Sequence, residues 1–101
     1  MDKNSLLEAT NEIVDALSDE LRARAVQGAI VHPDWSTLGQ SFVAIAIRSG
    51  NGHGAHFTLT VFHQGGVVLT MDGVAEPIDE GLADDISTFA CSIANAALFG
   101  V

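Results

Sequence analysis

The sequence predicts a two-layer α+β domain in which two helices cover one face of an antiparallel sheet. Apolar residues recur at helical spacing towards both ends of the chain and alternate at period two in its middle. Short glycine-rich segments separate the middle runs, which is typical of antiparallel strands. With 101 residues, the chain is expected to form a single domain, 1–101, since domains most often have about 100–150 residues. The expected order is α-β-β-β-α: a three-stranded meander, or a four-stranded one if residues 29–32 also pair.

The first helix is expected over about residues 5–26. Ser5 and Glu8 have the spacing of a capping box, and Gly28 is a suitable stop. The apolar positions share one helical face: Leu6, Leu7, Ile13, Val14, Leu17 and Leu21.

The middle of the chain is expected to form the sheet. Residues 29–32 form at most a short strand, because Pro33 lacks an amide donor, and residues 35–40 are expected to be a loop. Three strands follow, rich in β-branched and aromatic residues: 42–48, 55–63 and 67–71. The turns between them are 49–54 and 64–66.

The last helix is expected to follow Pro77, with Asp79 as N-cap and Gly100 at its end. Its buried face would comprise Leu82, Ile86, Phe89, Ala90, Ile93 and Ala97.

Strand parity divides the sheet residues into two faces. The expected core face comprises Val43, Ile45, Ile47, Phe57, Leu59, Val61, Leu69 and Met71. The opposite face comprises Phe42, Ala44, Ala46, Arg48, His56, Thr58, Thr60, Phe62, Val68 and Thr70. This second face is too apolar for an ordinary solvated face. Either the segment around Trp35 covers it, or it packs on a second subunit or a partner through Phe42, Ala44, Phe62, Val68 and Trp35.

The charge of the chain is strongly negative and unevenly distributed. With 13 acids against 4 Lys and Arg, the net charge is −9, which argues against direct contact with nucleic-acid phosphates or anionic membranes. Residues 35–71 contain no acid and one Arg, whereas residues 72–101 contain six acids and no base.

Two acidic surfaces are candidate sites for a basic partner. On the first helix, the acids Glu8, Glu12, Asp15 and Asp19 fall within an arc of about 60° and over about 16 Å. A second acidic zone comprises Asp79, Glu80, Asp84 and Asp85. The alternative is that these carboxylates only keep the protein soluble.

The sequence has no motif for catalysis, a metal or a cofactor. Among the histidines, His56 and His63 have opposite parity on one strand, and His53 lies in the glycine-rich turn 50–54, which lacks a phosphate-loop lysine. Cys91 has no histidine at a helical spacing. The run 32–35 (His-Pro-Asp-Trp) lacks a nucleophile, so it indicates a turn.

These observations favour a non-enzymatic protein-binding domain that acts in the cytoplasm as a homodimer. In its most concrete form the protein is a nucleic-acid mimic, an inhibitor that occupies a basic surface of a partner, anti-CRISPR-like in character. One alternative is a dimeric chaperone or immunity-type protein that binds an effector through the apolar sheet face. Another is a small enzyme that uses a His or Cys. No cofactor is expected. The N-terminus has no signal-peptide pattern, and the single cysteine excludes an intrachain disulfide.

Overall fold

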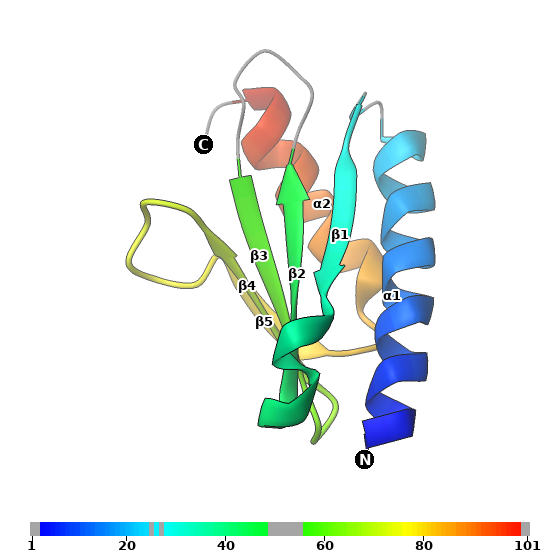
Figure 1. The fold of residues 1–101 in the computed structure, drawn as a ribbon. Coiled ribbons are helices and arrows are strands. Elements are labelled where there is room, and N and C mark those ends of the chain that lie inside the picture. Colours follow the sequence, from blue (N-terminus) through cyan, green and yellow to red (C-terminus); the bar gives the residue numbers. More distant parts are fainter. Residues whose placement is uncertain (1–2, 25, 27, 49–55, 100–101) are drawn as a thin grey trace.

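A computed structural model describes residues 3–24, 26, 28–48 and 56–99 of the chain, which form two helices and a sheet (Figure 1). The elements are α1 (Lys3–Ala23), β1 (Ile30–Asp34), the 3-10 helix η1 (Trp35–Gln40), β2 (Phe42–Arg48), β3 (His56–Phe62), β4 (Gly66–Met71), β5 (Asp79–Leu82) and α2 (Ile86–Phe99). The sheet is a meander with strand order β1-β2-β3-β4-β5, and every neighbouring pair is antiparallel. The predicted α+β class is confirmed, but the sheet has five strands rather than three or four.

The central strands agree closely with the sequence prediction. β2 has the predicted bounds, and residues of β2 and β3 face each other in register from Phe42–Phe62 to Arg48–His56. Seven of the eight predicted core positions are buried, and Met71 is partly buried against the same core. The turn predicted at 49–54 lies outside the described residues.

The first helix covers the core face of the sheet, as predicted, but its ends differ. It begins at Lys3, so Ser5 lies inside the helix and is not its N-cap, and it ends at Ala23. Its inner residues Leu6, Ile13, Leu17 and Leu21 are at most 3% exposed. Thr10 is buried among them without an energetic penalty, because its Oγ1 donates a hydrogen bond to the Leu6 carbonyl at 2.7 Å.

The segment between α1 and β2 is more regular than expected. β1 continues through Pro33 to Asp34, because β1 is an edge strand, where a missing amide donor is tolerated. The loop expected at 35–40 is the 3-10 helix η1. Asp34 caps it, with Oδ1 accepting from Ser36 N at 3.1 Å and from Ser36 Oγ at 2.6 Å.

The fifth strand is the main correction to the predicted fold. Residues 79–82 are a strand paired with β4, so Asp79 is not a helix N-cap, and α2 begins only at Ile86. Leu82, predicted on the buried helical face, is 61% exposed on β5. The physical reason is that pairing with residues 79–82 satisfies backbone groups that β4 would otherwise leave open. Hydrogen bonds from Ile78 N to Leu69 O at 2.8 Å and from Ala83 N to Gly65 O at 2.9 Å extend this pairing at both ends.

The remaining predicted core positions of α2 are correct. Phe89, Ala90, Ile93 and Ala97 are buried, and Ile86 is partly buried. Gly100, the predicted end of the helix, lies outside the described residues. Over the described parts of the chain, neither helix combines the length and apolar character that crossing a bilayer requires.

Candidate functional site

The sheet side chains that point away from the helices form a broad surface, here called the outer face. The register brings predicted members of this face together: Phe42 pairs with Phe62, and their ring centroids are 6.3 Å apart at an interplanar angle of 48°. Phe62, Val68 and Leu82 line one shallow pocket of about 430 Å³ at the β4–β5 edge. The outer face therefore has an apolar end to which four strands, β2 to β5, contribute.

The segment around Trp35 leaves most of the outer face open. η1 lies at the end of the sheet, beside the start of β2 (Figure 1). Leu38 packs against the core, and Trp35 itself is 39% exposed. Further along the outer face, Ala46 on β2 is exposed to solvent. Of the five residues predicted for a contact surface, Phe42, Ala44, Phe62 and Val68 share this face, while Trp35 lies at its margin in η1.

Two exposed apolar residues lie on the outer face although the sequence prediction does not place them there. Ile30 on β1 and Leu82 on β5 are 59% and 61% exposed. The β1–β2 register places Ile30 on this face, opposite Arg48. Leu82 lies in a segment without a strand signal, since residues 79–81 (Asp-Glu-Gly) are poor strand formers.

The four acids of α1 form the exposed row that helical spacing predicts. Glu8, Glu12, Asp15 and Asp19 are all exposed, opposite the buried leucines. One cation lies beside the C-terminal end of the row. Arg22 Nη1 lies 3.7 Å from Asp19 Oδ1, with both side chains more than three-quarters exposed. Such an exposed pair is weak, so the row remains strongly negative.

In the second acidic zone, two carboxylates accept hydrogen bonds within the fold and two are exposed to solvent. Asp79 Oδ1 accepts from Glu80 N at 2.9 Å, and its Oδ2 accepts from Ser92 Oγ at 3.0 Å, which ties β5 to α2. Asp85 Oδ2 accepts from Leu82 N at 3.1 Å. Glu80 and Asp84 are exposed. Because residues 79–82 are a strand, these four acids do not gather at a helix N-terminus.

The residues considered for chemistry are dispersed. His53 lies outside the described residues. His56 Nδ1 is 3.9 Å from Asp72 Oδ2, while His63 Nδ1 is 3.3 Å from the Ser41 carbonyl beyond the other end of β3. Within the described residues, no group of three or more His, Cys, Asp or Glu side chains is placed to hold a metal ion.

Cys91 and Asp34 each make contacts with residues close to them in the sequence. Cys91 is exposed on α2, and its Sγ lies 3.7 Å from Asn95 Nδ2. The pKa of the Asp34 carboxyl is lowered from its ordinary value of 3.8, first by the hydrogen bonds from the hydroxyl and amide of Ser36 and then by the nearby His32.

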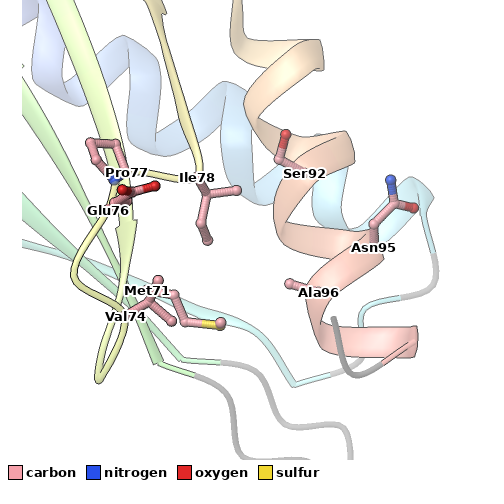
Figure 2. A pocket seen from close by; sticks show the side chains of 8 residues that line it. All are labelled: Met71, Val74, Glu76, Pro77, Ile78, Ser92, Asn95 and Ala96. Atoms are coloured by element: carbon pink, nitrogen blue, oxygen red, sulfur yellow. The ribbon is translucent and has the colours of Figure 1, made fainter.

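A second cavity lies between α2 and the loop that joins β4 to β5. Its volume is about 460 Å³, and Figure 2 shows Met71, Val74 and Ile78 facing Ala96 of α2 across it. Glu76, Ser92 and Asn95 supply polar groups around this apolar lining. We call it the α2 pocket.

Comparison with protein-family models, with curated proteins and with solved structures finds no significant match to this chain. Function is therefore inferred from the outer face, the acidic row and the α2 pocket.

Proposed function

We propose that the chain is a non-enzymatic protein-binding domain of the cytoplasm that pairs with a second copy through the outer face and directs its acidic helix α1 towards a basic partner. The observation that carries the proposal is the outer face: an apolar surface with Phe42 and Phe62 at one end, covered by neither helix. Apolar surfaces of this extent on small domains tend to be contact sites.

The size of the outer face is compatible with a dimer. Five strands about 4.8 Å apart, with seven residues at about 3.3 Å each in the longest strands, give a projected area of about 500 Å² per copy. Two copies would bury about 1,000 Å², which reaches the lower bound for a specific interface. Sheets commonly pack face to face in this way, with strand directions about 30° apart.

The charge distribution favours a second copy as the occupant. Residues 35–71, which contain β2, β3 and β4, hold no acid and one Arg, although the whole chain carries −9. The edge strands β1 and β5 add two acids to the outer face, Asp34 opposite Ala44 and Glu80 opposite Val68. Pairing of two outer faces would bury the nearly uncharged centre of the sheet, leave Glu80 at the β5 edge, and keep the two acidic α1 helices on opposite outer sides, where water and salt screen their repulsion.

The acidic row of α1 would then be the surface for a basic partner. Four exposed carboxylates over about 16 Å can pair with Arg and Lys side chains of a groove that otherwise holds nucleic-acid phosphates. In this role the protein is an inhibitor by mimicry, anti-CRISPR-like in character, and a dimer would carry two such rows.

A second candidate function is favoured by the pocket at the β4–β5 edge. Phe62, Val68 and Leu82 line a hollow of about 430 Å³ beside a strand of only four residues. An apolar side chain of an effector would fit there, as in a chaperone or immunity-type protein. In that case the outer face would hold a different chain instead of a second copy.

The oligomeric state tests the dimer directly. Sedimentation equilibrium between 1 and 100 µM is expected to show twice the monomer mass of 10.5 kDa, with little sensitivity to salt. Thr60→Lys places a charge at the centre of the outer face, between Ala44 and Val68 in the register. An unpaired buried charge costs about 3–5 kcal/mol, so the two copies in a dimer should weaken it by at least about 10⁴-fold.

Asn11→Lys is the matched control, because it makes the same charge change on the exposed face of α1. It should leave the mass unchanged. A wild-type protein that stays monomeric at 100 µM, or a Thr60→Lys variant that still dimerises, would refute the dimer.

The inhibitor role is tested by competition. Labelled DNA bound to a candidate nucleic-acid-binding protein should be displaced by the wild-type protein, with strong dependence on salt. A variant with Glu8, Glu12, Asp15 and Asp19 all changed to Gln should lose this displacement. Binding that survives the fourfold change would place the partner site elsewhere.

A further inference from the structure

We propose that the α2 pocket binds small cationic amphiphiles, with an aliphatic group inside the pocket and a positively charged head beside Glu76. The inference is independent of the proposed function, because it concerns a different surface of the molecule.

The lining of the α2 pocket selects an apolar body. Met71, Val74 and Ile78 from the sheet side face Ala96 of α2 across the space (Figure 2). At about 460 Å³ the cavity has the size of small-molecule sites. On its inner side Met71 and Ile78 pack against the hydrophobic core, whereas Val74 is 45% exposed at its open side.

The polar groups of the α2 pocket select the charge of the head. The Ser92 hydroxyl donates to Asp79, and the Asn95 amide contacts Cys91, so both have partners. Glu76 is exposed, and within the described part of the chain no ion pair joins it. Since residues 72–101 contain six acids and no Lys or Arg, nothing in this segment can neutralise an anionic head. A carboxylate, phosphate or sulfate head is therefore disfavoured, and an ammonium head is favoured.

The α2 pocket remains open in the proposed dimer. Met71 pairs with Phe57, whose side chain is buried in the core between sheet and helices. The pocket thus belongs to the helix side of the sheet, opposite the outer face. Ligand binding and dimerisation can therefore be measured separately.

The test uses three probes with one tail and different heads: octyltrimethylammonium, octanol and octyl sulfate, all as monomers. Amide chemical shifts are recorded during each titration. We expect shifts at residues 71–78 and 92–96, and an affinity order of ammonium, then alcohol, then sulfate. An exposed ion pair changes affinity by up to about fivefold, and repulsion of the sulfate head adds a similar factor, so ammonium and sulfate should differ by up to about 25-fold.

Charge reversal at the rim provides the decisive variant. Glu76→Lys should reverse the order of ammonium and sulfate. Glu12→Lys makes the same change in net charge on the exposed face of α1, and should leave the order unchanged. Reversal in both variants would show that net charge alone sets the order, which would overturn the role of Glu76.

A filling variant tests the cavity itself. Ala96→Phe should weaken all three probes by more than tenfold, with Ala23→Phe, at an exposed position of α1, as its control. Ala96 is only 6% exposed, so the larger side chain can also unfold the protein. If Ala96→Phe unfolds, Val74→Lys at the exposed rim replaces it. This variant should bind octyl sulfate more tightly than octyltrimethylammonium. Absence of ammonium binding at millimolar concentration, or shifts confined to the outer face, would overturn the proposal.

Discussion

Gly81→Ala tests the structural correction on which the outer face depends, the assignment of residues 79–82 to a strand. An added Cβ at Gly81 would lie 2.9 Å from Asp85 Oδ2 and 3.4 Å from Phe89 Cζ. Asp85 cannot move away freely, because the same Oδ2 accepts a hydrogen bond from Leu82 N at 3.1 Å. Phe89 is fully buried and already in contact, so the added Cβ cannot shift in its direction and the strain falls on the Asp85–Leu82 hydrogen bond.

The magnitude follows from a comparison with Gly66→Ala. Both glycines lie in paired strands, but a Cβ at Gly66 meets nothing within 4 Å. Each variant gains about 0.4–1 kcal/mol because alanine restricts the unfolded chain, and only Gly81→Ala adds overpacking, about 1–3 kcal/mol. The free energies of unfolding should therefore differ by about 1–3 kcal/mol. At about 4–8 °C per kcal/mol for a domain of this size, Gly81→Ala should melt at least about 4 °C below Gly66→Ala.

Urea unfolding monitored by circular dichroism measures this difference, and a thermal melt checks it. The helix predicted from the sequence would give the opposite sign, because alanine is favoured over glycine inside a helix by about 1 kcal/mol. If the free energy of unfolding of Gly81→Ala equals or exceeds that of Gly66→Ala, the packing of β5 against α2 is refuted.

Further expectations concern α1 and η1. Leu17→Ala should lower the free energy of unfolding in urea by about 2–5 kcal/mol, because Leu17 is fully buried. Leu7→Ala should lower it much less, because Leu7 is 36% exposed. Equal losses of stability in the two variants would contradict the orientation of α1. The carboxyl of Asp34 should titrate in NMR with a pKa below 3.8, and Ser36→Ala should raise that pKa. Since the folded pKa is the lower one, the Asp34–Ser36 contact stabilises the fold above the unfolded pKa and is lost as pH falls through the folded value. The melting-temperature difference between wild type and Ser36→Ala should therefore shrink from pH 6 to pH 2; a constant difference would argue against the ionic contact.

The predictable parts of the fold are those in which one segment carries its own periodicity. Alternation from Phe42 to Arg48 is enough to place Val43, Ile45 and Ile47 on one side and Phe42 on the other, because successive side chains of a strand point to opposite faces. The spacing of the leucines in α1 likewise places Glu8 and Asp19 on the solvent side.

The sequence predicts which residues share the outer face, but it does not predict which of them are in contact. Parity alone put Phe42 and Phe62 on a common face, but only the β2–β3 register brings their rings within 6.3 Å. Leu82 joins that face through β5, whose sequence has no strand signal. The α2 pocket could not be foreseen, since its walls come from a loop and a helix that are not adjacent in the sequence.

By itself, then, the sequence determined the α+β class, the core face of the central strands, the buried face of α1 apart from the exposed Leu7, and a charge of −9 concentrated outside residues 35–71. The tertiary structure decided that residues 79–82 are a strand, that the outer face extends from Ile30 to Leu82, and that a cavity opens beside α2. The physical reason is the range of the interactions. Hydrophobic periodicity acts within one segment and can be read locally, whereas backbone pairing with β4 and packing against Phe89 depend on residues that approach only when the chain folds.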